Sequence, residues 1–336
     1  MTAYILRRLL LMIPTLFGIT LVCFVLIQFV PGGPVEEVIF KMRSRGADRG
    51  SSAQRISAEE VKNIKAYYDY DKPAAVRYFM WVKKLLHGDL GNSFAYHKPV
   101  LDVIVSKFPV SLIFGITSFF LAYLVSIPLG VRKAMAHGGI FDAATSAIIF
   151  AGYVIPGYAL GILLIIFFAG GSYFDWFPIG NLVSDNFELL PLPAKALDLA
   201  RHMTLPLICY MVGEFAMLTL LMKNSMLEEL SKDYMRTALA KGLSMRQAVW
   251  RQAFRNGLIP IATGIGSIFL LLFTSALLIE RVFDLDGMGL LFYNSILSRD
   301  YNVVLGIIVL SSFAAMLGRL FSDLIYVVID PRIRFD

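Results

Sequence analysis

Charge is what this sequence has least of. Lysine, arginine, aspartate and glutamate make up 17% of its 336 residues, whereas soluble proteins carry about 25% of such residues. Hydrophobic residues reach 57%. This balance excludes an ordinary soluble domain and indicates an integral membrane protein. The basic residues behind the net charge of +6 lie mostly between apolar runs. No nucleic-acid-binding pattern accompanies them, so nucleic acid is not an expected partner.

Cysteines and catalytic motifs are also scarce. Cys23 and Cys209 each lie inside an apolar run, where a small buried hydrophobe is favoured over a disulfide or a metal ligand. The four histidines have no ligand-like spacing, so no metal site is expected. No lysine precedes a serine or threonine, which excludes a Walker A loop for ATP. A nucleophile elbow, a zinc-protease motif and a dinucleotide fingerprint are missing too. The sequence therefore predicts a protein that is not an enzyme and has no catalytic residues.

Long apolar runs dominate what is present. Six stretches can cross roughly 30 Å of hydrocarbon at about 1.5 Å per residue. They are residues 9–30, 108–131, 143–174, 203–222, 258–279 and 303–329. We expect the third to form one helix followed by a glycine turn at Gly170-Gly171. The sequence thus predicts an all-α integral membrane fold with six transmembrane helices.

The positions of basic residues indicate the orientation. The N-terminal pair Arg7-Arg8, the pair Arg132-Lys133 and the segment 223–259 fall on one side of a six-span arrangement. Loops rich in lysine and arginine stay in the cytoplasm, so both termini are predicted to be cytoplasmic. The first apolar run is too long for the core of a signal peptide and lacks a cleavage site. It is therefore expected to remain as a helix.

The spans divide the chain into three regions. Residues 1–30 form an N-terminal transmembrane helix, and residues 31–107 form an extracytoplasmic helical segment between helices 1 and 2. Residues 108–336 form a five-helix core with a cytoplasmic loop at 223–259.

The extracytoplasmic segment carries its own helix signals. Helices are expected at 57–68 after a capping box, at 73–86 between a proline and Gly88, and at 100–107 before Pro109. Its aromatic residues either pack against one another or form a docking face for an external binding protein.

Few ionisable residues lie within the apolar runs. Glu214 is the deepest, and Arg319 and Asp323 lie near the end of the last run. An ion-driven carrier usually buries charges near the middle of the membrane to bind its coupling ion. We therefore expect the energy for transport to come from another subunit. Glu214 either makes a polar contact with a neighbouring helix or lines a substrate pathway.

The basic segment 223–259 is the most informative part of the sequence. It carries seven lysines or arginines and three acidic residues. Ala238, Ala240 and Gly242 are small, so a helix there can sit closely in the groove of a partner, and Gly242 can end that helix with a positive φ. The basic residues around it can pair with acidic partner residues or with anionic lipid headgroups. They are Lys241, Arg246, Arg251 and Arg255.

This segment also carries a resemblance. Arg236-Thr-Ala-Leu-Ala-Lys-Gly242, followed by Arg255-Asn-Gly-Leu-Ile-Pro260, resembles the cytoplasmic coupling loop of ABC importer permeases, in the version of the dipeptide/oligopeptide branch. Many importers have Glu-Ala where this chain has Arg236-Thr237, and the peptide branch usually departs in this way. The likeness covers the whole chain and is typical of the first permease of a pair. It includes Pro31-Gly-Gly-Pro34, His87-Gly-Asp-Leu-Gly-Asn-Ser93, Glu280-Arg-Val-Phe283 and Asp330-Pro-Arg-Ile-Arg334.

A finer similarity is to the Yej-type permeases, which are linked to uptake of peptides and of the peptide–nucleotide antibiotic microcin C. It is carried by Ile127-Pro-Leu-Gly-Val-Arg-Lys133, Ala169-Gly-Gly-Ser-Tyr-Phe-Asp175 and Leu182-Val-Ser184.

The resemblance implies a type I ABC importer permease fold in the bacterial inner membrane, with oligopeptides or microcin C-like conjugates as cargo. It implies a second homologous permease, two cytoplasmic ATPases or one fused double ATPase, and an extracytoplasmic substrate-binding protein. ATP-Mg would be bound by the ATPases, and this chain would hold no cofactor. The residues implied to couple the chain to the ATPases are Arg236, Thr237, Ala238, Ala240, Lys241, Gly242, Leu243 and Ser244.

Two alternatives remain at this point. The same machinery can carry another cargo, such as nickel or an oligosaccharide. A different class of protein is a membrane-anchored receptor that senses a ligand through residues 31–107.

Overall fold

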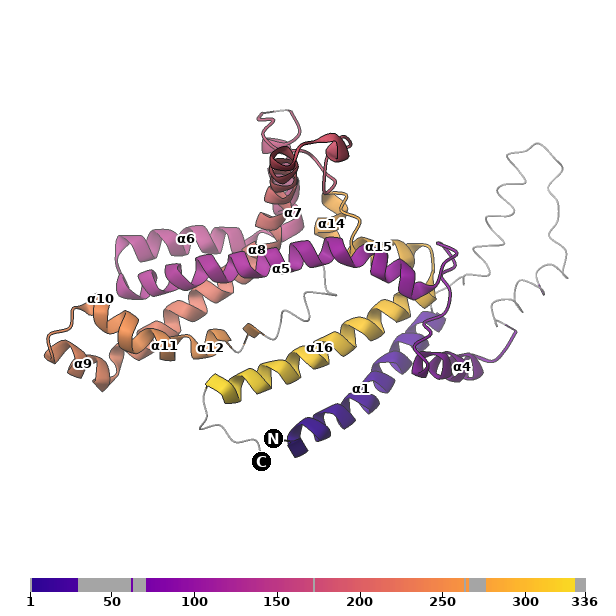
Figure 1. The fold of residues 1–336 in the computed structure, drawn as a ribbon, viewed down its shortest axis with the longest axis horizontal. Coiled ribbons are helices and arrows are strands. Elements are labelled where there is room, and N and C mark those ends of the chain that lie inside the picture. The colour runs from indigo at the N-terminus through magenta and orange to yellow at the C-terminus, as the bar shows by residue number, and fades with distance from the viewer. Residues whose placement is uncertain are drawn as a thin grey trace. The chain divides into compact units, whose positions relative to one another are not determined.

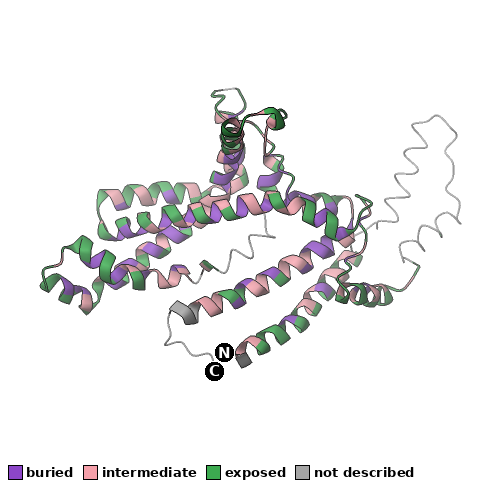
Figure 2. Cartoon of the chain, in the orientation of Figure 1, coloured by how far each residue is buried: buried purple, intermediate pink, exposed green. Residues whose placement is uncertain are grey.

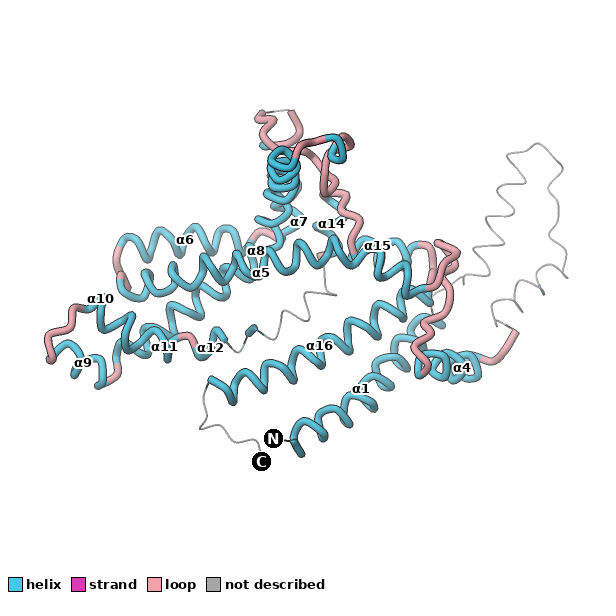
Figure 3. The backbone as a smooth tube through the Cα atoms, in the orientation of Figure 1, coloured by secondary structure: helices cyan, strands magenta, loops and turns pink. Residues whose placement is uncertain are grey.

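The fold is helical. The structure, a computed structural model, describes residues 2–29, 62, 71–171, 173–262, 264–265 and 276–329. In these ranges every regular element is a helix (Figure 1), and Figure 3 shows the loops between them. Within the described ranges, β-type pairing is limited to one isolated antiparallel bridge between Asn92 and Pro99. The predicted all-α class is confirmed.

Four of the predicted spans appear as long apolar helices. They are α1 (Thr2–Phe29), α5 (Val100–Met135), α8 (Leu192–Ser231) and α16 (Tyr301–Ile329). Helix α8 has 40 residues, which is about 60 Å at about 1.5 Å per residue. This length is about twice the hydrocarbon thickness, so α8 carries the chain well beyond the bilayer.

The third predicted span is broken, which corrects the expectation of one helix. Helices α6 (Ile140–Val154) and α7 (Gly157–Phe168) meet at an angle of 100°. Pro156 has no amide hydrogen and disfavours a helical residue before it. Ile155 is accordingly extended, with φ −79° and ψ 121°. The predicted turn after this region is present, because α7 ends at Phe168 and Gly171 has a φ of +67°.

The fifth predicted span, at 258–279, is described only at its ends. Helices α11 (Phe254–Gly257) and α12 (Ile259–Ala262) precede the gap at 266–275, and α14 (Leu277–Val282) follows it. The described residues contain four spans, or five if the bent pair counts as one. The count of six therefore stays a prediction. Two short helices lie elsewhere in the described chain, η1 (Phe187–Leu189) and α15 (Met288–Leu297).

Between the first two spans, one predicted helix is confirmed and one is wrong. Helix α4 (Ala74–Leu86) follows Pro73, and Gly88 beyond its end has a φ of +76°. The separate helix expected at 100–107 does not exist, because α5 continues through Pro109. Proline lacks an amide hydrogen, but a long membrane helix continues where neighbouring groups satisfy the freed carbonyl. The helix predicted at 57–68 lies outside the described residues, apart from Lys62.

The chain forms two compact parts. The large part comprises Met1–Ile5, Pro109–Gly289 and Ala314–Asp336, and the small part comprises Leu6–Phe108 and Leu290–Phe313. Burial alternates along the helices of each part, so each helix has a covered stripe and an open one (Figure 2). On α1 the open stripe is apolar, with Leu10, Ile13 and Leu26 exposed. Apolar residues are stable on such a surface when lipid is the solvent.

Candidate functional site

The most distinctive local structure of the large part is a short helix at its polar end. Helix α9 (Asp233–Ala240) follows α8 after a break at Lys232. Gly242 has a φ of +85°. Its amide donates to the Leu239 carbonyl at 2.9 Å, and the Leu243 amide donates to the Ala238 carbonyl at 3.3 Å. These two bonds form a Schellman motif, which requires a residue with positive φ at the glycine position. The predicted helix end at Gly242 is confirmed.

A second short helix begins directly after this glycine. Ser244 is the N-cap of α10 (Met245–Ala248). Its hydroxyl accepts from the Gln247 amide at 3.3 Å, and the Gln247 side chain accepts from the Ser244 amide at 3.1 Å. This reciprocal capping box fixes the entry to α10. The chain continues through the π-helical turn η2 (Val249–Ala253) into α11. We call residues 233–250 the coupling hairpin.

One face of the coupling hairpin packs on the ends of α5 and α8. Met235 and Ala238 of α9, and Ala248 and Val249 after the turn, are buried together with Met222 and Met226 of α8. Val131 and Ala134 of α5 belong to the same cluster, which we call the methionine core. Methionine fills irregular gaps between helices well. A displacement of the hairpin is therefore transmitted to α5 and α8 through direct packing.

The opposite face of the coupling hairpin is open. The predicted coupling residues divide between the two faces. Ala238 is buried in the methionine core and Leu243 is half-buried, so the Ala238 methyl contacts this chain itself. The exposed members are Arg236, Thr237, Ala240, Lys241, Gly242 and Ser244.

Sequence reasoning missed three apolar side chains on this open face. Leu239 is 38% exposed, Met245 49% and Trp250 46%. The Trp250 ring contacts the Phe254 ring, with centroids 4.6 Å apart. Exposed large apolar side chains surrounded by polar ones are typical of a protein-docking surface. Leu239 follows Met235 by four residues, a spacing that puts both on the same side of α9, so its exposure could not be read from the helical pattern.

A polar cluster fixes the angle between α8 and α9. Glu229, in the last turn of α8, accepts from the Lys232 ammonium at 2.5 Å and from the Tyr234 hydroxyl at 2.5 Å. The bond to Glu229 raises the pKa of Lys232. Burial, and then the same carboxylate, raise the pKa of Tyr234. Near neutral pH Lys232 is therefore a charged ammonium and Tyr234 keeps its hydroxyl proton. Charge-assisted hydrogen bonds from both to the Glu229 carboxylate hold the break between the helices.

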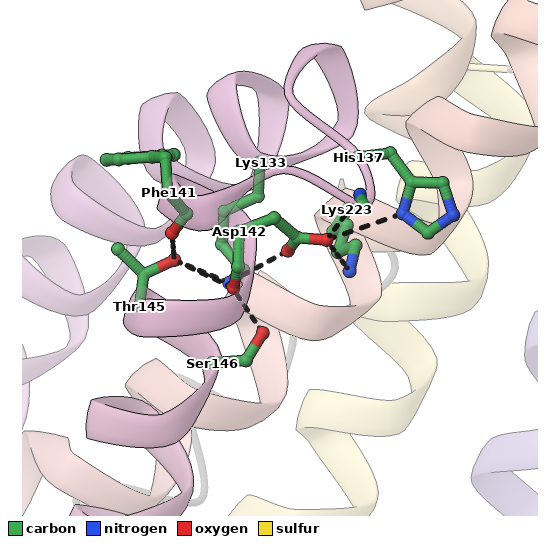
Figure 4. A network of polar contacts seen from close by, with 8 residues as sticks. Lys133, His137, Phe141, Asp142, Thr145, Ser146 and Lys223 are labelled. Atoms are coloured by element: carbon green, nitrogen blue, oxygen red, sulfur yellow. Dashed lines mark hydrogen bonds and ion pairs between the residues drawn. The ribbon is translucent and has the colours of Figure 1, made fainter.

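A buried ion cluster ties α8 to α5 and α6 at the first residue of the 223–259 segment (Figure 4). The Asp142 carboxylate is 2.8 Å from the Lys223 ammonium and 3.1 Å from that of Lys133, whose side chain is 0% exposed. Lys133 also donates to the Asp142 carbonyl at 2.9 Å, to Thr145 at 2.7 Å and to Ser146 at 2.8 Å. The carboxylate lies close to both ammonium groups, and its attraction for them offsets the cost of removing these charges from water.

The role of this cluster was not visible in the sequence. From the sequence, Lys133 was noted only for the positive bias and the Yej-type similarity, and Asp142 was not singled out. The contact joins residues 81 positions apart, and no local motif signals it.

Glu214 lies half-buried near the middle of α8. Among the described residues it has no hydrogen-bond or ion-pair partner. Met217, one turn further, is 65% exposed, and a Cβ added at Gly213 would meet nothing within 4 Å. The face of α8 that carries Gly213 and Met217 is therefore not covered by the described part of the chain. Near the end of α16, Asp323 accepts a hydrogen bond from the Tyr4 hydroxyl at 2.7 Å.

Glu280, the first residue of the Glu280–Phe283 motif, is fully buried beside α5 and α8. Its carboxylate accepts from Ser111 of α5 at 3.2 Å and from Tyr210 of α8 at 3.4 Å. Ser111 in turn accepts from the Met288 amide at 2.8 Å. The motif is therefore a structural anchor for α14 against the bundle.

Residues 126–335 match the family model described as binding-protein-dependent transport system inner membrane component. The chain belongs to this family, and it is a helical permease component of ABC transporters rather than an ATPase. It is 43% identical to the peptidoglycan transport system permease protein YejB of Agrobacterium fabrum, over 100% of this chain and 99% of the relative. It is 41% identical to the inner membrane ABC transporter permease protein YejB of Escherichia coli O157:H7, with both chains covered completely.

More distant relatives belong to oligopeptide systems. The oligopeptide transport system permease protein OppB of Escherichia coli K12 is 33% identical, again over the full length of both chains. The resemblance to the dipeptide/oligopeptide branch and to the Yej-type permeases is confirmed.

The ion cluster at Asp142 makes a testable contribution to stability. Asp142→Asn leaves two buried ammonium groups without their counter-charge. The expected loss is about 3–5 kcal/mol of unfolding free energy, by analogy with other broken buried pairs. The measurement is thermal or denaturant unfolding of the purified complex.

Asp233→Asn is the matched control. Its ion pair with Arg236, at 3.4 Å, is exposed, and its removal is expected to change stability by less than about 1 kcal/mol. Equal losses of unfolding free energy in the two variants would contradict a stabilising role for the buried ion cluster at Asp142.

Proposed function

We propose that this chain is a permease subunit of an ATP-driven importer of peptides, and that the coupling hairpin is where the ATPase subunit docks. The observation that carries the proposal is the two-sided hairpin. Its apolar inner face is part of the methionine core, and its open face combines basic and apolar side chains. Because no Walker A loop is present in the sequence, the chain needs a partner that hydrolyses ATP.

The geometry suggests how ATPase motion reaches the membrane. A push on the open face of α9 acts on Met235 and Ala238, and through the methionine core on Met222 and Met226 of α8. The Glu229 cluster keeps α9 at a fixed angle, and the Asp142 cluster makes the ends of α5, α6 and α8 move together. These packed helices then rock as a unit between outward and inward openings, as rigid-body transitions do.

The proposed complex follows from the family. It contains a second homologous permease, two cytoplasmic ATPases or one fused double ATPase, and an extracytoplasmic substrate-binding protein. ATP-Mg is bound by the ATPases, and this chain binds no cofactor. The chain sits in the bacterial inner membrane, in contact with its lipid, with both termini in the cytoplasm. The positive bias of Arg7-Arg8 and of the 223–259 segment supports this orientation.

The proposed regions are those of the sequence: a transmembrane helix at 1–30, an extracytoplasmic segment at 31–107, and a permease core at 108–336 with the coupling loop at 223–259. The continuation of α5 through Pro109 means that the second and third regions share one helix.

We also propose that Glu214 lines the substrate pathway. The uncovered face of α8 at Gly213 and Met217 supports this role.

Peptides are the proposed cargo because the OppB relatives are oligopeptide permeases by name. The YejB relative of Agrobacterium fabrum is a peptidoglycan transport permease by name. This favours peptides released from the cell wall as a second candidate cargo, alongside free oligopeptides and microcin C-like conjugates.

Uptake by the whole transporter tests the cargo. The complex is reconstituted in proteoliposomes with its ATPases and binding protein, and labelled oligopeptides, peptidoglycan peptides, nickel and an oligosaccharide are offered in turn. We expect ATP-dependent accumulation of peptide-containing compounds only. Accumulation of nickel or the oligosaccharide in place of peptides would overturn the cargo. Full accumulation without any ATPase would overturn the proposed mechanism.

The helix end at Gly242 gives a sharper test of the docking site. Gly242→Val places a β-branched residue at a φ of +85°, a conformation that such residues rarely adopt. The altered helix end is expected to displace the exposed hairpin face, so that ATPase co-purification and peptide uptake fall about tenfold or more, which corresponds to about 1.4 kcal/mol of docking free energy.

Gly88→Val is the matched control for this substitution. Gly88 also has a positive φ, +76°, and a Cβ added at either glycine would meet nothing within 4 Å. It lies at the end of α4 in the small part, so the control carries the same backbone strain away from the coupling hairpin. Equal loss of ATPase binding in both variants would show that strain alone, and not docking, is responsible.

A further inference from the structure

A cavity of about 120 Å³ with both apolar and polar walls lies within the small part, between α1, α4 and the start of α16. Its walls include Gln28 of α1, Arg77, Trp81 and Lys84 of α4, and Asn302 of α16. A water molecule occupies about 30 Å³, so the cavity has room for a group the size of a phosphate. The proposed transport function uses none of these residues.

The cavity presents hydrogen-bond donors and positive charge. Trp81 is 9% exposed, and among the described residues its indole N–H has no acceptor. A buried donor without a partner is costly, so such a group in a cavity points to a ligand that accepts its hydrogen bond. Arg77, which donates to Gln28 at 2.7 Å, and Lys84 add two positive charges. No aspartate or glutamate is among the described lining residues. The cavity is therefore suited to an anion.

An apolar groove of about 370 Å³ adjoins the cavity and shares Phe24 and Gln28 with it. It follows α1 from Phe17 to Phe29, with Phe79 of α4 along its other side. At about 1.5 Å per residue this stretch rises about 18 Å, which is somewhat more than half of the roughly 30 Å hydrocarbon core. The hydroxyl of Tyr78, also on the groove, is satisfied by Thr20 at 3.0 Å and by the Phe17 carbonyl at 3.2 Å. The groove surface therefore offers no free polar group at that point.

We propose that this cavity and groove form a binding site for an anionic phospholipid. Its phosphate lies in the cavity, where it accepts from the Trp81 indole and pairs with Lys84 and Arg77. One acyl chain follows the groove along α1 to about half the depth of the bilayer. Charge complementarity selects an anionic headgroup over a zwitterionic one, and the groove selects a lipid over a soluble anion. The site would hold α4 against the end of α1.

The test uses the assembled complex in nanodiscs and measures retained lipid by native mass spectrometry. The nanodiscs contain phosphatidylcholine with increasing phosphatidylglycerol. We expect phosphatidylglycerol to be retained in preference to phosphatidylcholine. Trp81→Phe, which keeps an aromatic ring but removes the indole N–H, and Lys84→Gln are each expected to weaken retention about tenfold, the factor for losing a hydrogen bond to a charged group.

Lys83→Gln is the matched control. Lys83 is a neighbouring exposed lysine on α4 that does not line the cavity, and its substitution is expected to leave retention unchanged. Equal retention of the two lipids would overturn the proposal, as would equal loss in the Lys83 and Lys84 variants. Inorganic phosphate or a peptide carboxylate that displaces phosphatidylglycerol at millimolar concentration would show a soluble-anion site instead. A normal unfolding temperature in Trp81→Phe separates loss of the lipid from loss of the fold.

Discussion

The packing of the coupling hairpin onto the ends of α5 and α8 is the interaction that joins the hairpin to the membrane helices. Met222 and Met226 of α8 and Met235 of α9 are buried in the same cluster, the methionine core. Without that contact, the hairpin would be a polar loop, and force applied to it would be absorbed by its own flexibility. Because protein interiors are close-packed, a displacement of Met235 must move its neighbours. The hairpin and the membrane helices therefore form one mechanical unit.

Charged residues are scarce in this chain, and several of the buried ones connect the hairpin to the membrane helices. The Asp142 cluster fixes the relation of α5, α6 and α8, and the Glu229 cluster fixes the break between α8 and α9. Each brings opposite charges together, so that the cost of removing them from water is offset by attraction and hydrogen bonds. Lys241 and Arg246 are exposed on the hairpin, where they can meet a partner or lipid headgroups.

The sequence predicted features that are local. Apolar runs revealed four of the spans, and Gly242 revealed the end of α9, since both depend on neighbouring residues alone. The break at Pro156 was missed because proline is tolerated in some membrane helices and breaks others, as the continuous helix through Pro109 shows. Tertiary context decides between these outcomes. The Asp142 cluster was missed for a similar reason, because Lys223 and Asp142 are far apart in the chain. The burial of Ala238 likewise depends on a helix from elsewhere.

Site-directed photo-crosslinking tests the central claim most directly. A crosslinking residue replaces Leu239 on the open face of the coupling hairpin, or Leu192 at the far end of α8, both of which are exposed in this chain. We expect that, in the assembled transporter, a crosslinker at Leu239 reaches the ATPase subunit and one at Leu192 does not. An ATPase crosslink from Leu192, together with none from Leu239, would contradict ATPase docking on the coupling hairpin.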